Sequence, residues 1–240
     1  MHPIVGAVCS ICGERILSPY AVSGIDGEPR CGLCRRISPP FAKAVAYGSY
    51  EGGLRELIHL LKYGGIPSAA SVLGRMLADA IKDLESDFPQ GTVAVVAVPL
   101  HRAKRGQRGF NQAELIVRAG LKLQHPPGRL RLLAGVLQRK RDTRSQTGLT
   151  GHQRRENMRG AFQVARPEDV KGRPVLVVDD VYTTGTTVSE CARVLRRAGA
   201  SRVWVATVAR TLKTSAREVE VTPRDESYEE VVPLVQAAGG

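Results

Sequence analysis

Apolar residues recur at helical spacing in two consecutive segments of the chain. The first segment ends at Gly64-Gly65, a pair typical of a helix C-terminus, and its apolar positions are Leu54, Leu57, Ile58 and Leu61. The second runs from about Ser68 to Leu84, and its apolar positions are Val72, Leu73, Met76, Leu77, Ala80, Ile81 and Leu84. Intervals of three and four residues place side chains on one helix face. The pattern therefore predicts two amphipathic helices, with His59 and Lys62 between the core positions and His59 on the surface.

Other segments are apolar runs of strand length. The pattern predicts a short strand over Ala42–Tyr50, and the run Val93–Leu100 has no polar interruption, as expected for a strand buried on both faces. The last two strands are predicted at Val175–Val178 and Arg202–Ala209. Between them lies a predicted helix that ends at Ala198-Gly199 and whose core positions are Val188, Cys191, Ala192 and Leu195. Strand, loop, helix and strand in this order form a βαβ unit, which predicts an α/β fold with a parallel sheet.

Two polar segments interrupt this pattern. The segment His101–Phe110 is basic and contains glycine, and we interpret it as a loop that leads into a helix over Asn111–Leu121 with Asn111 as its N-cap. The segment Gln138–Gly160 has few apolar residues. A polar stretch of this length inside a domain is usually a mobile functional loop or disordered, and we expect the same here.

The composition is that of an ordinary globular protein of 240 residues, with 42% hydrophobic and 24% charged residues. The apolar runs are too short for a bilayer-spanning helix, so no membrane insertion is expected. The segment Met1–Val8 has neither a cationic stretch nor a long apolar one, so it does not resemble a secretory signal. The expected location is the cytoplasm, where a disulfide framework is unusual.

Four of the five cysteines form two C-x2-C pairs near the start of the chain. They are Cys9, Cys12, Cys31 and Cys34. Two such pairs at this separation match a structural zinc site, because each pair can direct two thiolates at one metal and two pairs complete a tetrahedron. A segment this short cannot build its own core, so the metal would supply the missing stability. The fifth cysteine, Cys191, lies at a core position and is interpreted as a buried thiol.

The net charge of +12 comes from one segment. Residues 101–160, called the basic segment below, hold 15 Lys and Arg and three Asp and Glu, which accounts for the whole excess. Such a concentration is typical either of a solvated surface or of a site for phosphate, pyrophosphate or nucleic acid. Because the basic segment contains a single aromatic residue, Phe110, we expect any contact with DNA there to involve phosphates rather than bases.

The clearest candidate site follows the strand Val175–Val178. Two acids, Asp179 and Asp180, precede a turn that consists of Thr183, Thr184, Gly185, Thr186 and Thr187 and opens the next helix. In an open α/β sheet, ligands bind beyond the carboxyl ends of the strands. Hydroxyls, a glycine and a helix N-terminus favour a phosphate group, and carboxylates can accept hydrogen bonds from ribose hydroxyls. The residues therefore predict a site for a sugar phosphate.

The segment Val175–Thr187 resembles the phosphoribosyl pyrophosphate (PRPP) signature of the type I phosphoribosyltransferases. More of the chain resembles one family. The chain is similar, at several further places, to the ComF family of bacterial, competence-associated, phosphoribosyltransferase-like proteins. These places are the four-cysteine ribbon, Lys62-Tyr63, Val98-Pro99-Leu100, Arg108-Gly109-Phe110-Asn111-Gln112, Arg144-x-Gln146-x2-Leu149, Arg155, Asn157 and Gly160-Ala161-Phe162. The resemblance extends from about Cys9 to Ala209. It implies a type I phosphoribosyltransferase-like parallel sheet flanked by helices, with a small N-terminal four-cysteine zinc ribbon.

The resemblance also implies a role for each part of the site. Asp179 and Asp180 would bind the ribose hydroxyls, and Thr183, Thr184, Gly185, Thr186 and Thr187 the 5′-phosphate. The segment His101–Phe110 would bind pyrophosphate, through the cations Arg102, Lys104, Arg105 and Arg108. Gln138–Gly160 would be the loop that closes over the site. Mg2+ would accompany PRPP, and Zn2+ would be structural, held by Cys9, Cys12, Cys31 and Cys34.

Three functions agree with these expectations. The first is a competence protein that acts in DNA uptake and binds PRPP or a phosphoribosyl nucleotide. Its further partners would be single-stranded DNA and proteins of the competence machinery. The second is an active phosphoribosyltransferase that transfers the 5-phosphoribosyl group from PRPP to a nucleobase, a salvage reaction of nucleotide metabolism. The third is a plain nucleic-acid-binding ribbon protein, but residues 1–40 have a net charge of only +1, which favours a structural ribbon over one that binds DNA. The expected domains are a zinc ribbon over residues 1–38, a phosphoribosyltransferase-like domain over 39–211, and a tail over 212–240 without assigned function.

Overall fold

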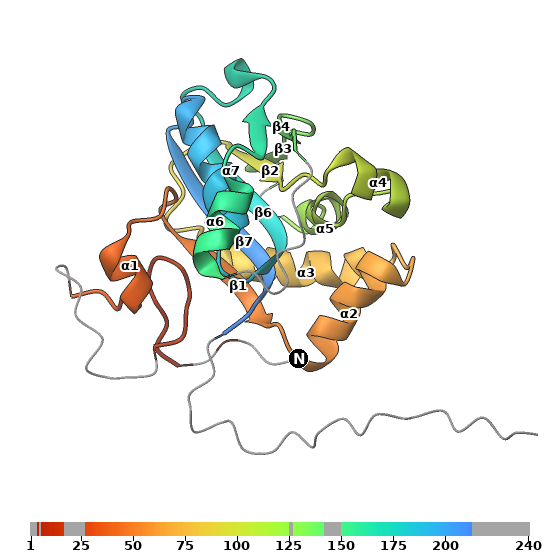
Figure 1. Ribbon diagram of the computed structural model, residues 1–240, viewed down its shortest axis with the longest axis horizontal. Coiled ribbons are helices and arrows are strands. Elements are labelled where there is room, and N and C mark those ends of the chain that lie inside the picture. Colours follow the sequence, from red (N-terminus) through yellow and green to blue (C-terminus); the bar gives the residue numbers. More distant parts are fainter. Residues whose placement is uncertain (1–3, 5, 17–26, 125–126, 142–149, 213–240) are drawn as a thin grey trace, which may run out of the picture.

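The computed structural model describes residues 4, 6–16, 27–124, 127–141 and 150–212, without the side chains of residues 151 and 152. Helices and strands alternate through most of this part of the chain (Figure 1). The helices are α1 (Gly32–Arg36), α2 (Gly52–Tyr63), α3 (Ala69–Lys82), α4 (Arg102–Arg108), α5 (Gln112–Leu121), α6 (Gly151–Met158) and α7 (Thr186–Arg197), with a 3-10 turn at Pro167–Asp169. The strands are β1 (Ala44–Ser49), β2 (Val93–Ala97), β3 (Leu130–Leu132), β4 (Leu137–Arg139), β5 (Phe162–Val164), β6 (Pro174–Tyr182) and β7 (Arg202–Arg210).

The main sheet has five parallel strands in the order β1-β7-β6-β2-β3. Its centre is β6, where Val177 pairs with Val205 of β7 on one side and with Val96 of β2 on the other. A separate antiparallel pair joins β4 and β5. The α/β class and the parallel βαβ unit β6-α7-β7 are therefore confirmed.

Each face of the sheet has its own apolar core. Helices α2, α3 and α5 cover one face, where Leu176 and Val178 of β6 lie in the same core as Trp204 of β7. Helix α7 covers the other face, where Val175 and Val177 are buried. Both faces of the central strands are thus shielded from water, which explains why their sequences are apolar without alternation.

The helix predictions are confirmed for α2, α3, α5 and α7, with one wrong position. Val72 was expected on the buried face of α3, but its side chain is 42% exposed. The buried face is instead formed by Ala69, Ala70, Leu73, Met76, Leu77, Ala80 and Ile81. Val72 lies one residue before Leu73, which turns it away from this face by about 100°.

The interpretation of His101–Phe110 as a loop was wrong, because seven of its residues form α4. The His101 side chain caps the helix by accepting a hydrogen bond from the Ala103 backbone N–H, at 3.4 Å. Gly109 ends it in the left-handed conformation, with φ of 80°. Between these two ends the residues are mainly Arg, Lys, Ala and Gln, which have high helix propensity.

For the described residues of Gln138–Gly160 the expectation of disorder was wrong, whereas the expectation of a mobile loop stays a prediction. Strand β4 begins this stretch, and α6 near its end has a capping box between Thr150 and Gln153. Met158 is fully buried, and the Arg141 guanidinium donates to the backbone carbonyls of Asn157 and Arg159. Residues 142–149, which include Arg144, Gln146 and Leu149, lie outside the described residues.

No helix in the described ranges combines the length and the apolar character needed to span a membrane.

Candidate functional site

The two acids of the candidate site lie inside β6, because this strand continues four residues beyond the predicted end, to Tyr182. Asp180 is 4% exposed, and Asp179 is largely buried with a smaller part of its surface open to solvent. The Asp180 backbone N–H donates to the Asp179 carboxylate at 2.9 Å. Both acids are near the carboxyl end of the central strand, the edge at which ligands bind in open α/β sheets.

A lysine that the sequence pattern left without a role lies against this acid pair. The Lys62 ammonium of α2 is 2.7 Å from the Asp180 carboxylate, and both side chains are largely buried. Burial opposes the charge of Lys62, but attraction to Asp180 outweighs it and raises the pKa of Lys62 above its usual value. The signal was present in the sequence. Lys62 follows the buried Ile58 by four residues, so it lies on the same inward stripe of α2.

Asp179 has the opposite electrostatic environment. Burial, together with repulsion from Asp180, raises the pKa of its carboxyl group well above the usual range, and Lys62 only partly offsets this. The acid pair therefore consists of one carboxylate with a cationic partner and one without sufficient compensation. A divalent cation or a set of ribose hydroxyls would supply the missing stabilisation of Asp179.

The threonine turn connects β6 to α7 and brings its hydroxyls to the helix N-terminus. Thr183 and Thr184 are exposed, whereas Thr186 and Thr187 are partly buried in the first turn of the helix. The Thr184 and Thr186 hydroxyl oxygens are 2.9 Å apart. Helix α7 has 12 residues, so its first N–H groups and its dipole favour an anion at this turn.

Gly185 is required at this turn for two reasons. Its φ of 72° lies in the left-handed region, which other residues rarely adopt. In addition, a Cβ atom built at Gly185 would lie within 2.2 Å of the Tyr182 hydroxyl oxygen. The Tyr182 side chain, itself buried, therefore packs directly against the turn and limits the conformations that the turn can adopt.

The four predicted cations of the basic segment all lie on α4. Strand β2, which precedes α4, is the neighbour of β6, so α4 and the threonine turn follow adjacent parallel strands at the same edge of the sheet. Three of the cations are exposed, namely Arg102, Lys104 and Arg105. Arg108 differs, because it is half-buried and donates to the Gln112 side chain at 2.7 Å.

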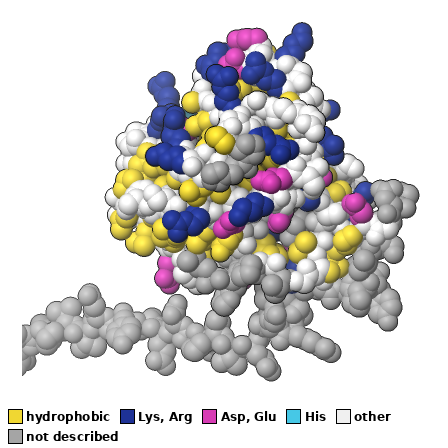
Figure 2. All heavy atoms as spheres, turned by 180° about the vertical axis from the view of Figure 1, so that it is seen from behind, with side chains coloured by type: hydrophobic (Ala, Val, Ile, Leu, Met, Phe, Trp, Pro, Cys, Tyr) yellow, Lys and Arg dark blue, Asp and Glu magenta, His cyan; other side chains and the backbone are white. Residues whose placement is uncertain are grey.

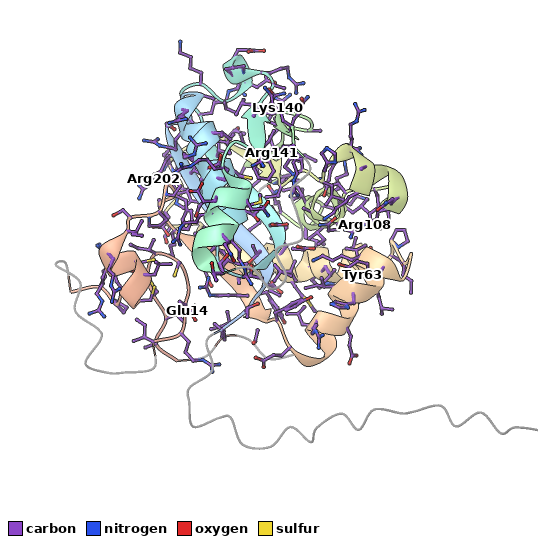
Figure 3. All side chains as sticks on the ribbon, in the orientation of Figure 1. Glu14, Tyr63, Arg108, Lys140, Arg141 and Arg202 are labelled. Carbon is purple, nitrogen blue, oxygen red and sulfur yellow. The ribbon has the colours of Figure 1, made fainter. Side chains whose placement is uncertain are left out.

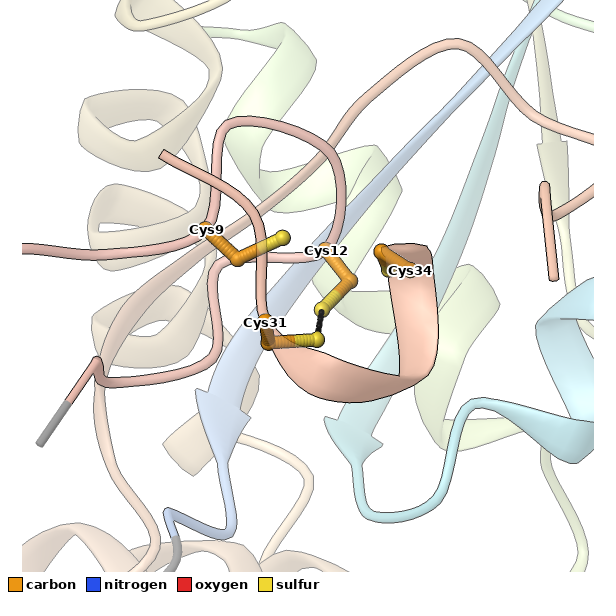
Figure 4. Close-up of side chains that lie close together, drawn as sticks. All are labelled: Cys9, Cys12, Cys31 and Cys34. Atoms are coloured by element: carbon orange, nitrogen blue, oxygen red, sulfur yellow. Dashed lines mark hydrogen bonds between the residues drawn. The ribbon is translucent and has the colours of Figure 1, made fainter. Parts of the chain in front are cut away.

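The four cysteines of the two C-x2-C pairs form one buried cluster (Figure 4). Their sulfur atoms all lie within 4.8 Å of one another, and those of Cys12 and Cys31 are 3.6 Å apart. A tetrahedral zinc site with Zn–S bonds of about 2.3 Å has sulfurs roughly 3.8 Å apart, so the cluster fits this metal. Hydrogen bonds with Cys12 and Cys34 lower the pKa of Cys31 to about 6. The residues that would hold zinc are thus the predicted ones, and Cys191 is a separate, fully buried thiol.

Arg210, at the end of β7, connects the cysteine cluster to the threonine turn. Its guanidinium donates to the Cys12 backbone carbonyl at 2.5 Å and to the Glu14 carboxylate at 3.1 Å. The same guanidinium lies 4.2 Å from the centre of the Tyr182 ring, which packs against Gly185. Arg210 is 3% exposed. The sequence pattern did not indicate Arg210, because this residue comes one position after the predicted end of the last strand.

We expect purified protein to contain one zinc ion per chain, as measured by elemental analysis. Cys31→Ser should lose the metal and lower the melting temperature, because the remaining three sulfurs leave a buried site that is incompletely coordinated. The matched control is Cys191→Ala, which alters a cysteine outside the cluster and should retain the zinc. Equal zinc contents in the two variants would contradict the assignment.

Comparison with known proteins links this geometry to one group. Residues 123–232 match the family described as Phosphoribosyl transferase domain. The chain is 32% identical over 212 residues to DNA utilization protein YhgH of Escherichia coli O6:H1, covering 85% of this chain and 91% of that protein. It is 31% identical over 222 residues to Competence protein F of Haemophilus influenzae, covering 88% and 93%. It is 23% identical over 200 residues to Competence protein ComFC of Bacillus subtilis, covering 83% and 75%.

Proposed function

Since the chain belongs to the ComF family, the family of Competence protein F, and has the type I phosphoribosyltransferase fold, we propose that it binds PRPP and acts in DNA uptake. In this proposal the protein also binds single-stranded DNA, and PRPP or a phosphoribosyl nucleotide occupies the site at the end of β6. The relatives' names associate them with competence and DNA utilization. A cytoplasmic location follows from the same proposal.

One observation carries the PRPP part of the proposal. The acid pair Asp179-Asp180 and the threonine turn lie at the carboxyl end of the central strand, directly before the α7 N-terminus. In the bound state, Asp179 would accept hydrogen bonds from the ribose hydroxyls, and the turn would donate to the 5′-phosphate. Mg2+ would supply the positive charge that allows two carboxylates and a polyanion to lie close together.

The α4 cations extend this site toward the pyrophosphate group. Arg102, Lys104 and Arg105 are exposed at the same edge of the sheet, and α4 contains no acid. Pyrophosphate and the DNA backbone share the same chemistry, since both present phosphate oxygens. We therefore propose that PRPP with Mg2+ and single-stranded DNA compete for this surface.

Binding of single-stranded DNA is expected to weaken steeply with salt. Each phosphate that is neutralised contributes about −0.7 to the slope of log K against log salt, so five contacts would give a slope near −3.5. The double variant Arg102→Glu/Arg105→Glu should weaken DNA and PRPP together, as measured by fluorescence anisotropy and calorimetry. Arg108 is left unchanged, because it has side-chain contacts of its own.

The matched control changes the net charge by the same amount, but in the N-terminal segment. Arg35→Glu/Arg36→Glu alters two exposed residues of α1 and should leave both affinities close to those of the unmodified protein. If the control variant, rather than the α4 variant, loses DNA binding, the cysteine-containing segment is the DNA site and the shared surface is wrong. Release of pyrophosphate in the presence of a nucleobase would identify the protein as a transferase.

A further inference from the structure

The aromatic side chain of Tyr63, which is outside the basic segment, lies against Arg108 of α4. The Arg108 guanidinium is 5.3 Å from the centre of the Tyr63 ring, which belongs to the last residue of α2 (Figure 3). The His59 ring lies edge-on to Tyr63, with ring centres 5.5 Å apart. His59 is in turn fixed by a hydrogen bond of 3.0 Å with the Tyr50 hydroxyl. Tyr63, His59 and Arg108 are called the aromatic platform below.

The platform remains open to solvent, although its centre is a large apolar ring. The Tyr63 side chain is 73% exposed, and two other exposed apolar residues, Leu60 and Ile66, lie within three residues of it. Figure 2 shows hydrophobic side chains below Lys and Arg side chains at the left edge of the face that it draws, the side on which α2 and α4 lie. An exposed apolar area beside cations is typical of an interaction site.

The aromatic rings of the platform belong to the same helix, α2, as the lysine that contacts the acid pair. Tyr63 directly follows Lys62, whose ammonium contacts Asp180 at 2.7 Å. The Tyr63 ring contacts Arg108 of α4, so a ligand stacked on Tyr63 lies next to the helix that carries the exposed cations. The surface therefore offers an aromatic face and a row of positive charges together, which is the combination that single-stranded nucleic acids require.

We propose that the aromatic platform stacks an unpaired nucleobase of a single-stranded nucleic acid whose phosphates contact α4. This inference rests on the proposed function, to which it adds a contact with bases. A base carried by a strand is favoured over a free base, because small ligands bind in pockets that enclose most of their surface. Neither the cavity of about 300 Å³ between α3 and α5 nor the smaller one beside β2 and β3 is lined by Tyr63 or His59. Phosphate contacts made by the same strand would hold the base on an open face.

The test compares oligothymidylate with an abasic oligonucleotide of equal length and charge. Tyr63→Ala in the full chain should weaken oligothymidylate binding about tenfold, the effect of losing one stacked base, and leave binding of the abasic strand unchanged. Tyr63→Trp should retain affinity, since the stacking face is kept. The matched control is Leu123→Ala, which also shortens an exposed apolar side chain. Leu123 is as exposed as Leu60, but it lies just after the end of α5 and outside the aromatic platform. An oligonucleotide containing 2-aminopurine should lose fluorescence quenching only with Tyr63→Ala.

The outcomes separate this inference from the proposed function. If the unmodified protein binds PRPP and oligothymidylate but Tyr63→Ala binds both equally well, the platform is wrong and the proposed function stands. If free thymine or adenine displaces the 2-aminopurine strand at low concentration, the platform binds free bases and the strand-borne form is wrong. If the unmodified protein binds PRPP but no oligonucleotide, the inference fails together with the DNA part of the proposed function.

Discussion

Asp179→Asn is expected to lower the affinity for PRPP with Mg2+ by at least about 100-fold. The proposed role of Asp179 is to accept hydrogen bonds from ribose hydroxyls, and each hydrogen bond to a charged group contributes about 1.5–3 kcal/mol. Asparagine has nearly the same shape but lacks the negative charge. Isothermal titration calorimetry measures the change directly, and an affinity equal to that of the unmodified protein would contradict the assignment.

The same substitution is expected to leave the fold intact. Because burial and Asp180 raise the pKa of Asp179 in the folded state, stability falls as the pH rises above the lower pKa of the unfolded state, and the full loss is present above the folded-state pKa. Asparagine does not ionise, so the melting temperature at neutral pH should stay constant or rise. Asp79→Asn, an exposed acid on α3, is the control that should change neither affinity nor stability.

Asp180 requires a different design, because it serves the fold as well as the site. Asp180→Asn leaves the largely buried Lys62 ammonium without its partner, which is costly in a protein interior. This variant should therefore unfold at a lower temperature. The double variant Asp180→Asn/Lys62→Met removes both charges and should recover stability while still failing to bind PRPP. Recovery of PRPP binding in the double variant would show that the acid acts only on Lys62.

Arg210→Met is expected to lower the free energy of unfolding by about 3–5 kcal/mol, the usual effect of removing one partner of a buried ion pair. It removes the guanidinium from the Glu14 carboxylate, which is 7% exposed, and from the Cys12 carbonyl. The loss of the Tyr182 contact should also weaken PRPP binding, because Tyr182 packs against Gly185 of the threonine turn. Chemical denaturation and calorimetry measure the two effects.

Two further variants test whether the loss of stability in Arg210→Met comes from the buried ion pair. Glu14→Gln/Arg210→Met removes both charges and should be more stable than Arg210→Met alone. Arg202→Met changes an exposed arginine at the start of the same strand, one that lies over the Trp204 ring, and should alter stability by no more than about 0.5 kcal/mol. Equal stability losses in Arg202→Met and Arg210→Met would mean that the buried network contributes nothing.

The central strands β1, β2, β6 and β7 and the helices α2, α3, α5 and α7 were predictable, because their apolar residues follow a clear pattern. The short elements β3, β4, β5, α1, α4 and α6 were not predicted. The apolar run that begins at Val93 predicts β2, and the apolar run that ends at Val178 predicts β6. The acid pair after Val178 indicates the edge of the sheet at which these two strands end. The sequence predicted least well the residues whose environment depends on segments that are distant in the chain. Strand β6 continues through Asp179 and Asp180 because β7 pairs with it as far as Tyr182 and Arg210, and no local pattern indicates this.

The contacts around the site were less predictable than its position in the sequence. Lys62 is far from the acid pair in the sequence, and the fold brings its ammonium to Asp180. In the same way, Tyr63 reaches Arg108 of α4, and Arg210 reaches Tyr182 beside the threonine turn. The single aromatic residue in the basic segment suggested that bases would not be contacted. Folding places the Tyr63 ring of α2 beside α4, so the aromatic rings at this surface cannot be counted within one segment of the sequence.

Binding of PRPP is the central claim, and calorimetry of the zinc-containing, unmodified protein with PRPP and Mg2+ tests it most directly. A saturable heat with one site per chain, which Asp179→Asn abolishes and Asp79→Asn preserves, is the predicted result. Absence of any heat from a folded protein that holds its zinc, or an equal heat from Asp179→Asn, would contradict the account.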